Sequence, residues 1–327
     1  GSVTLTAGSV DNAAGLISAG TSLALNADTL DNPAGRLLAQ ADMALDASSS
    51  INNRGGDIQA GGNLTAQATD QIDNTAGLMR ANGTLTLVTA HLDNTETKQD
   101  GTGIEAATAD LTAARLDNAG GAVRADDALV IRSTQRLDNT GGLVSSQKTL
   151  DVIDPGATRT LAIDNAGGTF LAGTRLSLQA QALSGAGTLV SHGDLALDTV
   201  ANLHHTGTLT TAGDLRLTTA GTVTNDGTLQ AGDTLAIAAQ ALTNTATGTL
   251  AGDAVDLALA GALTNRGLID GGETLITAGT LDNLGTGRLY GDHLAIAAGT
   301  LNNLAESGIA PVIAARERLD LGVGTLA

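Results

Sequence analysis

Histidine and aspartate are the side chains whose spacing in this sequence could support metal binding or catalysis. His204 and His205 are adjacent, and neighbouring side chains on a strand point to opposite faces, so the two cannot bind one metal ion together. His192 lies near a different turn. His293 follows Asp292 in a turn, with no Ser or Cys nucleophile placed beside it. The histidines therefore indicate turn variants, and we expect no metal site, no cofactor and no catalytic residue.

Pairs of glycine and aspartate recur at turns and could gather divalent cations along a column of carboxylates. They stand at Gly193-Asp194, Gly213-Asp214, Gly232-Asp233, Gly252-Asp253 and Gly291-Asp292. Calcium-binding repeat arrays need tandem Gly-Gly-x-Gly-x-Asp nonapeptides, and this chain has no such array. Ordinary solvated turns are the favoured interpretation, with loose cation binding as the alternative.

The most regular polar residue is an asparagine that follows an apolar residue and, most often, an Asp or a Thr. It recurs at Asn12, Asn32, Asn53, Asn74, Asn94, Asn118, Asn139, Asn165, Asn225, Asn244, Asn265, Asn283 and Asn303, mostly in steps of 19 to 21 residues. Two repeats lose it and keep the frame, at Leu183-Ser184-Gly185 and Leu203-His204-His205. Asn tolerates the left-handed conformation of sharp turns, and stacked Asn side chains can form a hydrogen-bonded ladder. We predict a structural role for this Asn, and a solvent-facing Asp before it.

Short strands are the elements that must position these asparagines. Apolar residues alternate, as in Leu195-x-Leu197 and Leu215-x-Leu217, between segments rich in Gly, Asn and Asp. The repeat is too short for a βαβ unit, which needs roughly 30 residues. Three strands per repeat predict an all-β fold, a right-handed parallel β-helix (solenoid) of about fifteen rungs of roughly 20 residues. At about 4.8 Å per rung, the predicted rod is roughly 70–75 Å long.

We expect residues 1–327 to form a single continuous β-helix array, because a repeat array is one body even when its length suggests two domains. Both ends fall inside a repeat, no polar cap is visible, and Gly1-Ser2 resembles a cloning scar, so the chain is interpreted as excised from a longer one. Loop insertions are predicted near 95–102, 153–160 and 304–318. They are expected to leave three different corners, which argues against one composite binding site.

Composition limits the classes of partner. The chain has 16 Lys and Arg against 34 Asp and Glu, a formal net charge of −18. Nucleic acids and anionic lipid surfaces need clustered basic residues, so we predict neither as a partner. Cysteine is absent, and no apolar run approaches the roughly 18 residues that span a membrane, so no membrane insertion is expected. Phe170 and Tyr290 are the only aromatic residues, which fits a thin core with little room for rings.

The repeat resembles the haemagglutinin repeat of the filamentous haemagglutinin family over essentially the whole chain. The clearest matches are Leu116–Val123 (Leu-Asp-Asn-Ala-Gly-Gly-Ala-Val) and Leu137–Val144 (Leu-Asp-Asn-Thr-Gly-Gly-Leu-Val). The resemblance implies a secreted exoprotein at the surface of a Gram-negative bacterium, either an adhesin or a contact-dependent growth inhibition exoprotein. It also implies two-partner secretion through an outer-membrane transporter, a role in virulence, and a receptor or glycan on a target cell as a candidate partner.

Three functions remain, in decreasing order of preference. The first is a structural stalk that extends and presents adhesive or toxin-delivery parts away from the cell. The second is a rod that is itself an adhesin segment for a host-cell or bacterial receptor. The third is a carbohydrate-active β-helix enzyme, which needs two convergent carboxylates roughly 5–10 Å apart. The sequence places its acidic residues in repeating turns, so we expect no enzyme activity.

Overall fold

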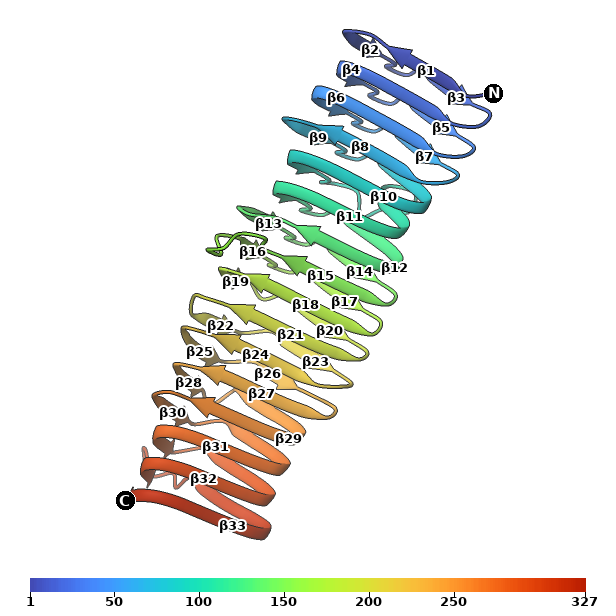
Figure 1. Cartoon of the computed structure of the whole chain (residues 1–327). Coiled ribbons are helices and arrows are strands. Elements are labelled where there is room, and N and C mark those ends of the chain that lie inside the picture. The colour runs from blue at the N-terminus through green and yellow to red at the C-terminus, as the bar shows by residue number, and fades with distance from the viewer. The chain divides into compact units, whose positions relative to one another are not determined.

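The structure, a computed structural model, describes residues 1–327 and contains strands but no helix. Its internal contacts divide the chain into two compact units, Gly1–Gly173 and Thr174–Ala327. In both units the strands recur in a fixed order of three, which we call the Gly strand, the Leu strand and the Asn strand of a rung. Adjacent Leu and Asn strands often merge into one long strand (Figure 1).

The first unit holds the first seventeen strands. They are β1 (Val3–Thr6), β2 (Ser9–Asp11), β3 (Leu16–Ala19), β4 (Leu23–Asp31), β5 (Arg36–Ala39), β6 (Met43–Asn52), β7 (Asp57–Ala60), β8 (Leu64–Ala68), β9 (Gln71–Asp73), β10 (Leu78–Asp93), β11 (Gly103–Asp117), β12 (Ala122–Arg132), β13 (Arg136–Asp138), β14 (Leu143–Ser146), β15 (Thr149–Ile153), β16 (Ala162–Asp164) and β17 (Thr169–Ala172).

The second unit holds the remaining strands. They are β18 (Arg175–Ala180), β19 (Ala182–Ser184), β20 (Thr188–Ser191), β21 (Asp194–Thr199), β22 (Leu203–His205), β23 (Thr208–Thr211), β24 (Leu215–Thr219), β25 (Thr222–Asn225), β26 (Thr228–Gln230), β27 (Thr234–Ala239), β28 (Ala241–Asn244), β29 (Thr249–Leu259), β30 (Ala262–Asn265), β31 (Leu268–Leu284), β32 (Arg288–Leu304) and β33 (Val312–Leu326).

Within each unit, a strand pairs in parallel with the equivalent strand of the next rung. In the first unit β4 pairs with β6, which sets Leu25 beside Leu45. In the second unit β21 pairs with β24, which sets Leu197 beside Leu217. Equivalent residues of successive rungs therefore stack in columns, and the prediction of an all-β, parallel β-helix is confirmed. Whether the two units form one continuous array stays a prediction.

The core of each unit is the column of inward Leu, Ile, Val and Ala side chains. Leu25, Leu45, Leu197 and Leu217 are at most 2% exposed. Full burial of such a side chain contributes roughly 1.5–3 kcal/mol. Phe170 is fully buried in the first unit, beside Val144 of the neighbouring rung, so the interior accepts a ring where a smaller residue precedes it.

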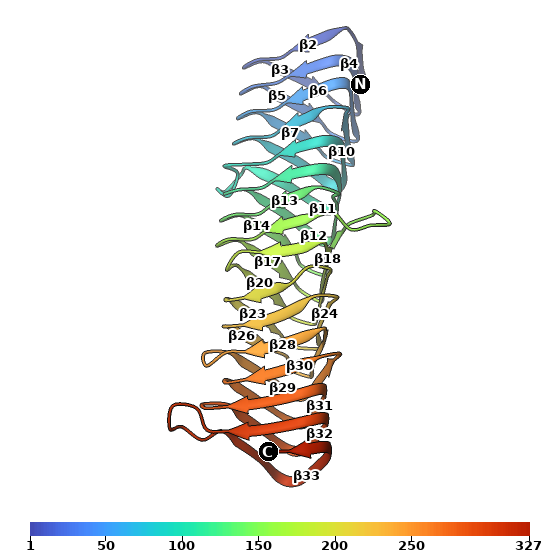
Figure 2. The same ribbon diagram turned by 90° about the vertical axis from the view of Figure 1, so that its left-hand side faces the viewer.

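The predicted insertions are loops, and Figure 2 shows two of them leaving the stacked strands. In residues 154–160 the Asp154 carboxylate accepts backbone N–H groups from Gly156 at 3.0 Å and from Leu161 at 2.7 Å. Burial alone would raise the pKa of Asp154, but these hydrogen bonds outweigh it and lower the pKa. The loop is therefore anchored on one carboxylate at its base.

One expectation about the loops is wrong. The three insertions were expected to leave three different corners, yet β33 begins at Val312, which pairs with Arg288 at the start of a Gly strand, so the third insertion precedes a Gly strand. At the corner before the Leu strand, the register between β32 and β33 shifts by only one residue, between Gly291 and His293. The insertion near 304–318 thus lies mainly at the Asn corner, between the Asn strand and the next Gly strand. The loop near 95–102 leaves its own unit at that same kind of corner.

Candidate functional site: the asparagine ladder and the outer grooves

In the first unit, the asparagines form an unbroken hydrogen-bonded ladder. Each side-chain Nδ2 donates to the Oδ1 of the Asn one rung further along the chain. The distances are 2.6 Å (Asn12–Asn32), 2.7 Å (Asn32–Asn53 and Asn53–Asn74) and 2.8 Å (Asn74–Asn94, Asn94–Asn118, Asn118–Asn139 and Asn139–Asn165). Stacking at the strand spacing is what brings identical amides within bonding distance.

The second hydrogen of the side-chain amide also has partners. Asn53 Nδ2 reaches the carbonyl of Leu78, the first residue of a Gly strand, at 3.0 Å, and Asn94 Nδ2 reaches that of Ala122 at 2.9 Å. Asn53 and Asn94 are 0% exposed. A buried amide costs free energy unless its donors and acceptors are paired, and here both ends of the amide are used. The ladder therefore holds successive rungs together from inside.

The left-handed residue of the turn is two positions after the Asn, whereas the sequence suggested the Asn itself. In the turns that follow the ladder asparagines of the first unit, the positive φ angles belong to Ala14 (50°), Ala34 (52°), Gly55 (60°), Ala76 (54°), Glu96 (61°), Gly120 (57°), Gly141 (62°) and Gly167 (63°). The Asn cannot occupy that conformation because its side chain must point inward from the end of a strand. Asn and the left-handed residue therefore have separate tasks in one turn.

Close approach of the backbone explains the glycine that follows. A Cβ on Gly142 would lie 2.2 Å from the Asn118 carbonyl oxygen and 2.5 Å from Asn139 Oδ1. No real Cβ makes such contacts, so any larger residue must push the rungs or the ladder apart. This Gly is required by packing, whereas Gly141 beside it has open space around it.

The Asp before the Asn was expected to lie in solvent, and the structure shows it half-buried. Asp73 Oδ1 accepts the backbone N–H of Thr75 at 3.0 Å, and Asp73 Oδ2 pairs with Arg54 at 3.1 Å. Asp117 pairs with Arg115 and with His91, each at 2.9 Å. Burial alone would raise the pKa of both carboxyls, but these partners outweigh burial and lower it. Arginines between the rungs thus prevent mutual repulsion of the carboxylates.

The second unit carries a ladder over fewer rungs. Its Nδ2–Oδ1 distances are 2.9 Å (Asn225–Asn244, Asn244–Asn265 and Asn265–Asn283) and 2.8 Å (Asn283–Asn303). The residue before each ladder Asn lies on the outside of its rung. It is Thr224, Thr243 and Thr264 in the first three rungs of this ladder and Asp282 in the fourth. The inner amides therefore do not depend on an outer column of carboxylates.

His205 occupies the ladder position of its rung, and His204 faces outward. The predicted opposite orientation is confirmed, since His205 is 7% exposed and His204 is exposed. His205 Nε2 lies 3.1 Å from the Thr228 carbonyl, and His204 Nε2 lies 2.5 Å from Asp226 Oδ2. A buried histidine at the ladder position of its rung is a feature that the sequence interpretation missed, although its place in the repeat frame was visible.

The aspartates of the Gly-Asp turns bond the next rung. Asp194 Oδ1 accepts the backbone N–H of Asp214, and Asp214 Oδ1 accepts that of Thr234, both at 3.1 Å. The turns at Asp194 and Asp214 thus bridge rungs rather than only facing water. No group of three or more His, Cys, Asp and Glu side chains is placed to hold a metal ion in residues 1–327.

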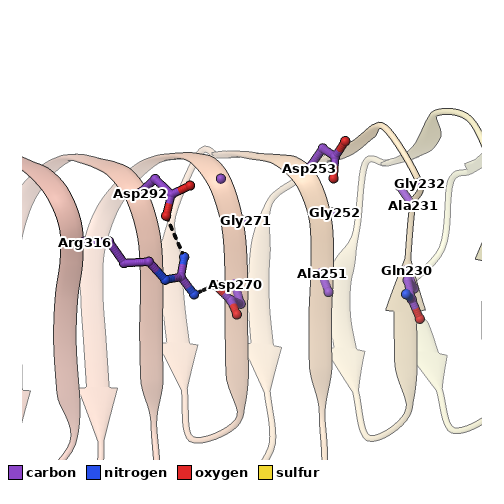
Figure 3. Close-up of a pocket in the computed structure, with 11 residues that line it drawn as sticks. Gln230, Ala231, Gly232, Ala251, Gly252, Asp253, Asp270, Gly271, Asp292 and Arg316 are labelled. Carbon is purple, nitrogen blue, oxygen red and sulfur yellow. Dashed lines mark hydrogen bonds and ion pairs between the residues drawn. The ribbon is translucent and has the colours of Figure 1, made fainter.

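Shallow grooves run along the corner between the Gly strand and the Leu strand. One of them, of about 750 Å³, lies in the second unit and is lined by Gln230, Asp253, Asp270, Asp292, Arg316 and small residues (Figure 3). Arg316 pairs with Asp270 at 3.3 Å and with Asp292 at 3.0 Å. In the first unit the same corner forms grooves that share Arg80 and Asn82.

Beside the larger groove, His293 joins three rungs. Its Nδ1 lies 2.6 Å from Glu273 and its Nε2 lies 3.0 Å from Glu317. The hydrogen bond to Glu273 is the main reason why the pKa of His293 is raised. The groove and this cluster are built from ion pairs that link rungs, an arrangement that holds the surface together.

Comparison with known proteins gives one match. The family model of the haemagglutinin repeat matches residues 140–202 and 190–267. The resemblance to the filamentous haemagglutinin repeat is therefore confirmed for this stretch, which includes the histidine rung and four ladder asparagines. Searches among curated proteins and among solved structures returned no match. No helix in the structure has the length and apolar character needed to cross a bilayer.

Proposed function

We propose that this chain is a structural stalk segment of a large secreted bacterial exoprotein, which extends and presents adhesive or toxin-delivery parts away from the cell. The observation that carries the proposal is the asparagine ladder within the matched haemagglutinin repeats, from Asn225 through Asn244 to Asn265. A stalk must keep its rungs in register without help from a partner, and the ladder adds a bond at every rung that it joins.

The outer surface supports the same proposal. A binding surface that dominates affinity usually offers buried Trp, Tyr or Arg anchors. Here the arginines near the Asn corner, such as Arg54 and Arg115, are engaged with carboxylates of their own unit. A net charge of −18 also keeps such surfaces apart from one another.

Export and localisation follow from the same proposal. We propose secretion to the surface of a Gram-negative bacterium, with an outer-membrane transporter as the partner during export. A chain without cysteine forms no disulfide that could block its passage in an unfolded state. Each rung that emerges can stack on the rung before it, because a rung contacts only its neighbours.

A second candidate is that the rod itself is an adhesin segment. The loop before β33 favours it, because Leu304 is 46% exposed and Ile309 is 45% exposed. Arg266 holds this loop by a two-pronged ion pair with Glu306, at 2.7 and 3.0 Å. An apolar tip on a fixed loop could contact a receptor or glycan on a target cell.

We propose no enzymatic activity. In the groove of Figure 3, Asp270 and Asp292 are both engaged by Arg316. A general acid and a general base must both be free to exchange a proton with a substrate, whereas here one arginine occupies both carboxylates. This arrangement supports a structural role for the groove.

Cell binding is the experiment that separates stalk from adhesin. The labelled chain is titrated on host epithelial cells and on bacterial cells, in parallel with a glycan panel. The stalk proposal expects no saturable binding at any concentration. Saturable binding that disappears when residues 305–310 are shortened, and persists when the loop 154–160 is shortened, would replace it with the adhesin proposal. Small-angle X-ray scattering tests the prediction of one array roughly 70–75 Å long.

A further inference from the structure

One rung of the second unit replaces the ladder amide with an imidazole. β22 pairs with β25 so that His205 stands beside Asn225. His205 Nε2 lies 3.1 Å from the Thr228 carbonyl, and Asn225 Nδ2 lies 3.3 Å from the equivalent carbonyl of the next rung, that of Thr249. Asn225 Oδ1 accepts the backbone N–H of Gly227 at 3.3 Å. The histidine therefore reproduces the amide's bond to the Gly strand, while the ladder proper starts at Asn225.

The surroundings of His205 offer no negative charge. β19 packs against β22, and β23, β25 and β26 contain only Leu, Thr, Val, Asn and Gln side chains. The sequence of β19 is Ala-Leu-Ser. The titratable residues next to His205 and Asn225 in the sequence are His204 and Asp226, which bond to each other on the outer face. A positive charge on His205 would be buried without a counter-ion, which is strongly unfavourable.

The protonation preference of His205 agrees with this geometry. Burial lowers its pKa most, the charge of His204 lowers it further, and hydrogen bonds to the backbone of Thr228 and Gly207 act in the opposite direction. In an opened rung the imidazole would regain a pKa of about 6.5. The rung is therefore most stable above about pH 6.5, loses stability as the pH falls below that value, and loses no more below the folded pKa.

We propose that residues 203–230 form an acid-sensitive joint, a rung that opens locally when His205 takes up a proton while the rungs of the Asn225–Asn303 ladder stay closed. One exposed histidine, His293, acts in the opposite sense. His293 bridges Glu273 and Glu317 across three rungs, and its raised pKa means that its contribution is present in acid and lost as the pH rises. Acid therefore strengthens the outer ion pairs of His293 and weakens the rung in which His205 is buried. The proposal is independent of the stalk or adhesin role.

Hydrogen exchange of backbone amides, read by mass spectrometry, tests the joint on the whole chain. Exchange is compared at about pH 7.5 and about pH 5.5, after correction for the intrinsic rate at each pH. Peptides within 203–230 are expected to lose protection by up to about tenfold per pH unit, while peptides within 244–283 keep theirs. The variant His205→Asn, which restores the repeat residue, is expected to remove this pH dependence. The matched control His204→Thr, which copies Thr224, is expected to retain it.

Three results would overturn the proposal: no extra exchange in 203–230 in acid, the same extra exchange in His205→Asn, or its loss in His204→Thr. A measurement on the unaltered chain covers the case in which a variant does not fold. The imidazole Cε1–H resonance of His205 is followed through a pH titration by NMR. A midpoint below about 6.5 supports the joint, and a midpoint at or above that value overturns it.

Discussion

The ladders of the two units differ in continuity and in what accompanies them. In the first unit every rung from Asn12 to Asn165 contributes an amide, and aspartates with interleaved arginines line the outside of the same turns. In the second unit Gly185 and His205 stand at ladder positions before the amides start at Asn225, and threonines precede three of its five ladder asparagines. A continuous ladder thus needs asparagine at the buried position, whereas the outward position before it accepts several kinds of residue.

Removing an amide from the middle of the first ladder should have the largest effect. Asn94→Leu leaves the donor of Asn74, the acceptor of Asn118 and the Ala122 carbonyl without their partner. We expect a loss of about 3–4 kcal/mol in the free energy of unfolding, measured with urea. Asn303→Leu, at an exposed position, is the control, and an equal loss there would mean that burial of the amide does not matter.

A methyl group on the glycine under the ladder should have the next largest effect. Gly142→Ala puts a Cβ against the Asn118 carbonyl and Asn139 Oδ1, and we expect it to cost about 2–3 kcal/mol. Gly141→Ala is the matched control, because that turn position has open space and is occupied by Ala14 and Ala34 elsewhere. It should cost about 1 kcal/mol or less, from the left-handed φ alone. Similar losses in urea unfolding for both variants would contradict the packing argument.

Acid should affect the outer column of the first unit. The pKa of Asp117 is lowered in the folded state, so its stabilising contribution is present above the unfolded value of about 3.9 and is lost as the pH falls through the folded pKa. Asp117→Asn, which copies Asn52 in the same column, should flatten the acid limb of stability against pH. At neutral pH it should cost on the order of 1 kcal/mol after solvent screening. An unchanged acid limb would show that the carboxylate is not linked to folding.

The smallest effect is expected on the outer column of the second unit. Thr243→Asp introduces the first unit's residue beside Asn244 without touching the ladder amide. We expect a change within about 0.5 kcal/mol, measured by urea unfolding. A loss as large as that of Asn94→Leu would show that the outer residue is part of the ladder after all.

The period of the repeat was enough to predict the fold, because equivalent residues of a stacked strand fall in columns whatever the turns between them. The positions of the thirteen asparagines could be assigned from the sequence for the same reason. The half-buried state of Asp73 and Asp117 could not, since it depends on arginines that lie 19 residues earlier, at Arg54, or two residues earlier, at Arg115.

The corner of the third loop and the burial of His205 also needed the structure. Insertion length fixes how many residues are extra, and only the pairing of Val312 with Arg288 shows where they leave the stack. The sequence showed that His205 stands where the repeat has its Asn, but the replacement of an amide by an imidazole was interpreted as a turn variant. Its bond to the Thr228 carbonyl depends on the size of the ring, which reaches across the turn.

All the ladder amides point the same way along the chain, since in each pair the earlier Asn donates and the later one accepts. Their dipoles therefore add within each ladder, as peptide dipoles do along a helix, and mutual polarisation strengthens each bond. The ladder has a direction: each carbonyl faces the rung before it, and each N–H faces the rung to come. A rung that forms later in a vectorial process meets a donor already held in place. Within each ladder, assembly from the amino-terminal side thus finds a donor already in place at every step.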